Sequence, residues 1–68
     1  MEVGKHYKLN KDINMTNAFV SADSDFVEGE TIEVLEIDVV QGVVTVQDPF
    51  FPKEKWCANL KELEEAVK

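Results

Sequence analysis

Cysteine and histidine are almost missing from the sequence, which has only Cys57 and His6. A disulfide needs two cysteines, and a zinc site of the usual type needs several cysteine or histidine ligands. Cys57 and His6 are also the one nucleophile-and-base pair that the chain could offer, and the residues around them match no hydrolase signature. We therefore expect no catalytic residue, no metal and no cofactor, with Cys57 as a small hydrophobic residue and His6 on the surface.

Long apolar runs are missing too, because the longest has only a few residues. A transmembrane helix needs roughly 20. Residues 1–4 lack the basic and apolar regions of a signal peptide. The sequence therefore predicts a cytoplasmic protein that does not enter a membrane, and the unpaired cysteine agrees with a reducing compartment.

Basic residues are scarce: 7 lysines and no arginine stand against 14 acidic residues, which gives a formal net charge of −7. No basic residue lies between Lys11 and Lys53. Sustained negative potential repels phosphate, so direct binding of nucleic acid or of an anionic membrane is disfavoured, whereas a basic protein is attracted. The acidic residues of this stretch are Asp12, Asp23, Asp25, Glu28, Glu30, Glu33, Glu36, Asp38 and Asp48.

The length of 68 residues allows one small domain. A chain of this size buries only about 60 % of the surface that it exposes when unfolded. The hydrophobic fraction of 44 % and the β-branched and aromatic residues nevertheless favour a folded protein over a disordered one. Its stability must come from packing or from a partner.

The N-terminal half of the sequence predicts one strand followed by a long loop. Residues 3–9 alternate in the way that a half-buried strand requires. Residues 10–24 are rich in Asn, Asp, Ser and Thr, which favour turns, and we expect at most a short strand at residues 18–20. Residues 25–30 indicate a turn that leads into the next strand, with Gly29 at positive φ and Phe26 pointing inward.

The clearest strand covers residues 31–40. Ile32 and Val34 fall on one face, the pattern slips by one residue at Leu35, and it resumes with Ile37 and Val39 pointing inward. A slip of one residue predicts a β-bulge. We expect the core to contain Ile32, Val34, Ile37, Val44, Val46 and Trp56.

The C-terminal half predicts a hairpin, a further strand and a helix. Gly42 separates two valine-rich runs, so residues 43–47 should return beside residues 31–40. Proline cannot donate to a ladder, so this strand should end at residues 48–49, and a last short strand should cover residues 55–58.

Asn59 is a favourable helix N-cap because Glu62 follows three residues later. Leu60, Leu63 and Val67 fall on one face of the expected helix. A helix of about ten residues is unstable alone in water, so this face must dock on the sheet.

The order of these segments resembles small SH3-like barrels. A strand with Gly4 and Tyr7 is followed by a long loop, by residues 26–30 leading into Ile32 and Val34, and by a hairpin and a Trp-containing strand. The resemblance covers residues 3–58 and implies a mainly β fold, a barrel of about five strands, to which residues 59–68 add a short C-terminal helix. The paired-tyrosine motif that docks proline-rich peptides is missing, so that activity is not implied. Small acidic modules of this kind also resemble proteins encoded by bacteriophages.

Clustered carboxylates at Asp23, Asp25, Glu28 and Glu30 could suggest a calcium site. Counted from Asp23, however, the fifth and sixth positions of an EF-hand loop would be Val27 and Glu28, where a ligand and a glycine are required. We interpret this segment as a solvated acidic turn.

Phe50, Phe51 and Trp56 belong either to the core or to an exposed recognition patch. Neighbours on an extended segment point to opposite faces, so we expect one of the two phenylalanines to be exposed.

We expect a non-enzymatic protein-binding module, a regulator or inhibitor of a host protein encoded by a phage. Its partner should have a basic surface, and the chain itself should be a monomer or a weak homo-oligomer. One alternative is an acidic mimic of nucleic acid that occupies the basic groove of an enzyme; another is a structural subunit of a larger assembly. The acidic residues could also serve solubility alone. The candidate partner-binding residues are Asp23, Asp25, Glu28, Glu30, Glu33, Glu36, Asp38, Phe50 and Phe51.

Overall fold

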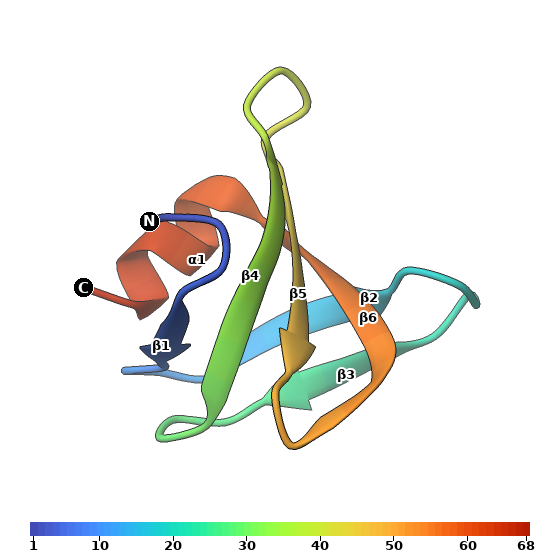
Figure 1. The fold of residues 1–68 in the computed structure, drawn as a ribbon, viewed down its shortest axis with the longest axis horizontal. Coiled ribbons are helices and arrows are strands. Elements are labelled where there is room, and N and C mark those ends of the chain that lie inside the picture. Colours follow the sequence, from blue (N-terminus) through green and yellow to red (C-terminus); the bar gives the residue numbers. More distant parts are fainter.

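The computed structural model describes residues 1–68 as six strands and one helix (Figure 1). All neighbouring strands are antiparallel and form one sheet with the order β1-β4-β5-β6-β2-β3. The elements are β1 (His6–Lys8), β2 (Ile13–Asn17), β3 (Asp23–Phe26), β4 (Thr31–Asp38), β5 (Val43–Asp48), β6 (Phe51–Asn59) and α1 (Leu60–Ala66).

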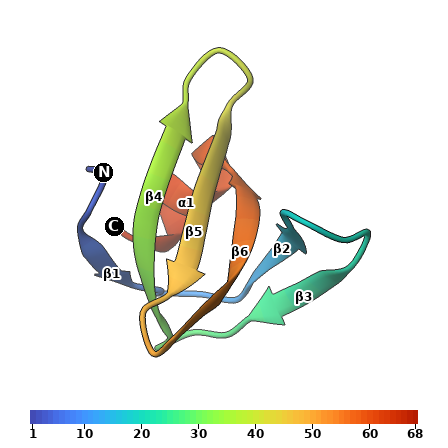
Figure 2. The same ribbon diagram turned by 45° about the vertical axis from the view of Figure 1, so that its right-hand side comes forward.

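The expected fold class, mainly β with a short C-terminal helix, is confirmed. The barrel of about five strands is not, because the six strands do not close and β1 and β3 remain the two edges of the sheet. Figure 2 shows the reason: the hairpin of β2 and β3 turns away from the long hairpin of β4 and β5, so β1 and β3 do not meet. The relation to SH3-like barrels stays a prediction.

The core lies between the sheet and α1, which packs against β2, β5 and β6. The expected positions Ile32, Val34, Val44 and Val46 are fully buried, as the alternation predicted. Ile37 and Trp56 are only half-buried and pack against the edge of the core. The buried hydrophobic residues are Leu9, Ile13, Met15, Phe26, Ile32, Val34, Val44, Val46, Ala58, Leu63 and Ala66.

The predicted bulge and hairpin are confirmed. The register between β4 and β5 shifts between Val34 and Glu36, which leaves Leu35 as the extra residue. The turn after β4 ends at Gly42, whose φ of 71° favours glycine. Asp38 stabilises this turn because its Oδ1 accepts hydrogen bonds from the backbone N–H groups of Val40 and Gln41.

The loop predicted for residues 10–24 is wrong, because it contains β2 and the start of β3. Ile13 and Met15 are buried and alternate with exposed polar residues. The polar composition of the segment favoured a loop and so led to the wrong prediction. Residues 18–20 are not a strand. Asn17 Oδ1 accepts hydrogen bonds from the N–H groups of Phe19 and Val20, which turns the chain there. The turn expected at residues 25–30 begins later than predicted, because residues 25 and 26 belong to β3 and the chain turns only after Phe26.

The helix begins where the sequence predicted. Asn59 Oδ1 accepts a hydrogen bond of 3.1 Å from the N–H of Glu62, and Leu63 is fully buried. Ala66 is buried as well, whereas Leu60 and Val67 are half-buried. This one helix is neither long nor apolar enough to cross a membrane.

Candidate functional site

A cleft of about 230 Å³ opens between β3 and the turn that joins β5 to β6. Four of its residues carry carboxylates and three are aromatic, and we call it the acidic-aromatic cleft. It is lined by Ser24, Asp25, Phe26, Glu30, Asp48, Phe51, Glu54 and Trp56.

The inner aromatic part of the cleft is fixed by contact between two strands. Phe26, the last residue of β3, is buried and meets the ring of Trp56 edge to face. Trp56 lies in β6, where it is the register partner of Val46 on one side and of Asn17 on the other. Since both neighbouring strands hold the Trp56 backbone, the inner end of the cleft is preformed.

The outer aromatic part is exposed. Phe51 begins β6 opposite Asp48 and is 74 % exposed, while Phe50 in the preceding turn is 77 % exposed. The expectation that only one of the two would be exposed is wrong, because neither phenylalanine packs against the core. Asp48 Oδ1 accepts a hydrogen bond of 2.8 Å from the N–H of Phe50, which holds this turn.

Three of the four acidic residues of the cleft, Asp25, Glu30 and Asp48, accept hydrogen bonds through their side chains, and none of the four has a cation partner. Asp25 Oδ1 accepts a hydrogen bond of 2.9 Å from Asn14 Nδ2, and Glu30 Oε2 accepts one of 3.0 Å from the N–H of Val27. None of them is in an ion pair, because the ion pairs of the chain involve only Glu2, Glu33 and Glu65. The nearby Lys55 donates to Gln47 Oε1 and to the carbonyl of Pro52 instead. The negative charge of the cleft is therefore uncompensated within the chain.

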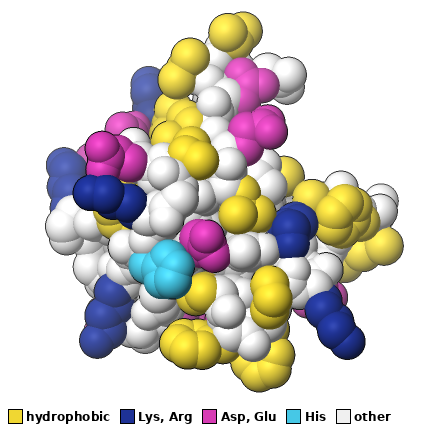
Figure 3. All heavy atoms as spheres, in the orientation of Figure 1, with side chains coloured by type: hydrophobic (Ala, Val, Ile, Leu, Met, Phe, Trp, Pro, Cys, Tyr) yellow, Lys and Arg dark blue, Asp and Glu magenta, His cyan; other side chains and the backbone are white.

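The candidate acidic residues do not form one face. Asp25 and Glu30 line the cleft, Asp23 lies beside it on β3, and Glu28 is exposed in the following turn. On the face shown in Figure 3, the acidic side chains stand in separate groups with lysines and hydrophobic side chains between them.

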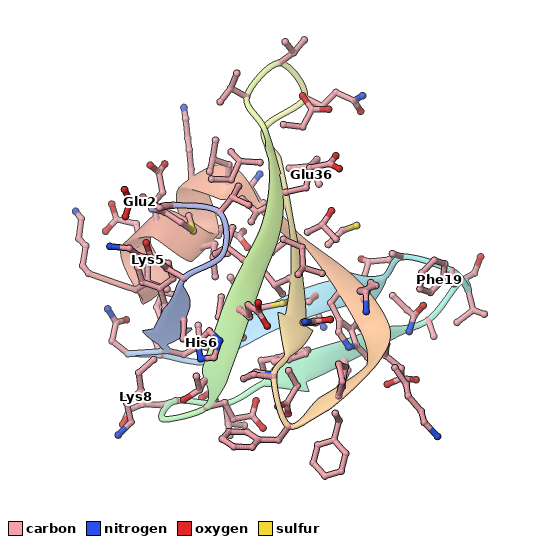
Figure 4. All side chains as sticks on the ribbon, in the orientation of Figure 1. Glu2, Lys5, His6, Lys8, Phe19 and Glu36 are labelled. Carbon is pink, nitrogen blue, oxygen red and sulfur yellow. The ribbon has the colours of Figure 1, made fainter.

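The three candidate acids of β4 lie away from the cleft. Glu33 accepts a hydrogen bond of 2.9 Å from Gln47 Nε2, and its Oε1 lies 3.8 Å from His6 Nε2. Glu36 is exposed and points outward from β4 in Figure 4. Asp38 stabilises the turn between β4 and β5, because its Oδ1 accepts hydrogen bonds from backbone N–H groups of that turn.

The sequence-based candidates did not include Asp48 and Glu54, Phe26 was assigned to structure alone, and Trp56 was left open between the core and a recognition patch. One signal was available: the turn at residues 49–50 makes Asp48 the neighbour of Phe51 in the antiparallel pair. No local pattern relates these residues to β3, because β3 approaches them only through the pairing of β2 with β6.

Four other exposed hydrophobic residues lie at the tips of two hairpins, while Val3 and Val27 are exposed elsewhere. Val39 and Val40 lie in the turn after β4, and Phe19 and Val20 lie in the turn after β2, where Figure 4 places Phe19 at the far end of the molecule. Only the tip with Phe50 and Phe51 adjoins the acidic-aromatic cleft. That tip also encloses a crevice of about 400 Å³, which is lined only by residues 50–54, at the turn and the start of β6.

Among the His, Cys, Asp and Glu side chains, no group of three or more could hold a metal ion. His6 is exposed on the edge strand β1, as expected. Cys57 is half-buried, with its Sγ 4.0 Å from Thr45 Oγ1.

Comparison with known proteins gives no match: no protein-family model fits the chain, and no curated protein or solved structure is significantly similar to it.

Proposed function

We propose that the chain is a non-enzymatic binding module that recognises a basic protein, and that the acidic-aromatic cleft receives one arginine or lysine side chain of that partner. One observation carries the proposal: four acidic residues, none of them in an ion pair, line the same cavity as three aromatic residues. A cationic side chain complements both features.

The chemistry of the cleft suits a guanidinium or ammonium group. A cation over the face of Trp or Phe is attracted by the ring quadrupole. Carboxylates at the rim add charge-assisted hydrogen bonds, for which the planar guanidinium of arginine is the best donor. Glu30 is already oriented by its own hydrogen bond, so less of its side-chain entropy is lost when the cation arrives.

The size of the cleft favours a side chain over a small-molecule ligand. Pockets that bind drug-sized molecules or cofactors measure about 300–1,000 Å³. The cleft, at about 230 Å³, lies below that range and opens to solvent beside the exposed ring of Phe51. Phe51 can contact the apolar stem of the entering side chain or its neighbours, which is the role that aromatic residues have in interface hot spots.

The net charge of the chain supports the same partner. With a formal charge of −7, the molecule attracts basic proteins over distances of about one Debye length, roughly 10 Å at 0.1 M salt. Such attraction raises association rates without specifying a contact. The acidic-aromatic cleft would supply the specificity.

The test uses two short capped peptides of glycine and serine that differ at one central residue, arginine in one and neutral citrulline in the other. Each is titrated into the ¹⁵N-labelled chain. We expect the arginine peptide to shift the amide signals of Asp25, Glu30 and the residues around Trp56, including its indole N–H. The citrulline peptide should shift none of them. Arginine-dependent shifts spread evenly over all acidic residues, or no difference between the peptides, would refute the proposal.

A further inference from the structure

The free edge of β3 offers unpaired backbone groups directly beside the acidic-aromatic cleft. β3 is the last strand of the sheet and pairs with β2 alone. The N–H of Asn17 donates to the carbonyl of Ala22, which makes this pair a hydrogen-bonded one. Because hydrogen-bonded and non-hydrogen-bonded pairs alternate in an antiparallel ladder, the N–H and C=O groups of Asp23 and Asp25 point away from β2.

No other segment of the chain uses these groups. The backbone hydrogen bonds outside the strand ladders include none to the N–H or C=O of Asp23 or Asp25. Two donors and two acceptors, spaced two residues apart, are therefore available along one edge. This is the pattern to which an additional strand pairs.

We propose that an extended basic segment of the partner pairs with the free edge of β3 as an additional strand and places one basic side chain in the acidic-aromatic cleft. Ser24 and Phe26, on the same face of β3, line that cleft. A paired strand lies about 4.8 Å from β3, and its alternate side chains point to the same face. This inference rests on the proposed function and adds the binding mode.

Charge decides between a basic segment and a second copy of the chain. Two β3 edges in contact would bring Asp23 and Asp25 of one copy against the same acids of the other, and like charges across a strand pair are destabilising. The opposite edge, β1, presents His6 and Lys8 (Figure 4), but a copy that offered β1 would bring a second net charge of −7. A basic segment of another protein has neither disadvantage.

The probe is a capped peptide of about seven residues, a usual strand length, in which arginine and valine alternate with threonine. It is added to the full ¹⁵N-labelled chain, and amide hydrogen exchange is measured with and without it. We expect the amides of Asp23 and Asp25 to exchange about tenfold more slowly in the complex, because they gain acceptors. The amides of His6 and Lys8 on the opposite edge are the matched control and should not change.

Two N-methylated versions of the peptide test the backbone contact without changing the protein. One carries methyl groups on the arginine and valine nitrogens, and the other on the threonine nitrogens, so each version has one blocked edge. If the peptide binds as a strand in a single orientation, only one of its edges faces β3. The affinity of one methylated version should then be about tenfold weaker than that of the unmodified peptide, and the affinity of the other should be nearly unchanged.

The outcomes separate this binding mode from the function on which it rests. If the arginine peptide binds but both methylated versions bind equally well, strand addition at β3 is wrong while the basic partner stands. If the arginine peptide does not bind, or if a version with citrulline in place of arginine binds equally well, the proposed function is wrong. Protection of His6 and Lys8 together with a mass that rises with protein concentration would overturn the inference in favour of a second copy.

Discussion

Phe26 and Trp56 meet edge to face, with their ring centroids 5.5 Å apart and their ring planes at 74°. The contact joins the end of β3 to the middle of β6, although the two strands are not neighbours in the sheet. The pairing between β2 and β6 is short, with Thr16 opposite Cys57 and Asn17 opposite Trp56. The ring contact therefore supports the position of the β2–β3 hairpin, together with the buried Ile13 and Met15, and fixes the inner end of the acidic-aromatic cleft.

The first prediction concerns this contact. Phe26→Leu keeps an apolar side chain but removes the aromatic pair, which contributes about 0.5–1.5 kcal/mol beyond buried area. We expect urea unfolding to show a loss of stability of about that size and the Trp56 fluorescence to change in the native state. Phe19→Leu is the matched control, because Phe19 is 72 % exposed. Equal stabilities for the two variants would show that the ring contact does not support the hairpin.

The second prediction compares two isoleucines of β4. Ile32 is fully buried, whereas Ile37 is half-buried at the edge of the core. Truncation of a buried isoleucine costs about 2–5 kcal/mol, through lost transfer energy and the cavity that remains. Ile32→Ala should therefore lower the free energy of unfolding by that amount, and Ile37→Ala by clearly less. Equal losses in chemical denaturation would mean that Ile37 is as buried as Ile32.

The third prediction concerns the helix cap. Asn59→Ala removes the acceptor for the N–H of Glu62 and should lower stability by about 1 kcal/mol. Asn59→Asp keeps an acceptor at the same place and should be nearly neutral, as measured by thermal unfolding. If the aspartate variant loses as much as the alanine variant, the side chain acts through some contact other than the cap.

Most of the region from β4 to α1 could be predicted from the sequence, because its signals are local. Alternation of isoleucine and valine defines β4 and β5, one slipped residue marks the bulge, and Gly42 marks the turn. The capping pair Asn59 and Glu62 marks the start of α1. β2 gave a weaker signal, because its alternation rests on only two apolar residues, Ile13 and Met15, among five positions rich in polar residues.

The acidic-aromatic cleft could be predicted only in part. Asp25, Glu30 and Phe51 were among the candidate residues, but as members of a wide acidic face and a separate aromatic segment. They meet because β2 pairs with both β3 and β6, which are far apart in the sequence. Such pairing depends on the packing of the whole chain and leaves no trace in a local pattern.

The fourth prediction tests which carboxylate belongs to the site. Glu54 lines the cleft and makes no hydrogen bond through its side chain, whereas Glu36 is also exposed but lies on the outer side of β4. Glu54→Gln should weaken binding of the arginine peptide about two- to fivefold, because an exposed ion pair contributes a free energy that corresponds to a change in affinity of about this size. Glu36→Gln removes the same charge elsewhere and should have a smaller effect. If both variants bind equally, only the total charge matters and the cleft has no specific role.

The fifth prediction separates long-range attraction from the contact at the cleft. Charge reversal by Glu36→Lys should weaken binding of the arginine peptide at low salt, because Glu36 contributes only to the overall potential. Near 1 M salt the Debye length falls to about 3 Å, so this variant should then bind like the unchanged chain. Phe51→Ala removes an exposed ring at the mouth of the cleft, and its effect should persist at high salt because apolar contact is not screened.

The measurement is the dissociation constant of each variant at low and at high salt, with the unchanged chain alongside. Glu36 is the suitable acid for the reversal because its side chain is exposed, whereas Glu33 is hydrogen-bonded to Gln47 and its loss would disturb β5. The expected pattern is a crossover: the Glu36→Lys effect disappears with salt and the Phe51→Ala effect remains. If the Phe51→Ala effect disappears together with the charge effect, the ring makes no contact with the ligand. The peptide would then be held by charge alone, and the acidic residues would have no partner more specific than any basic protein.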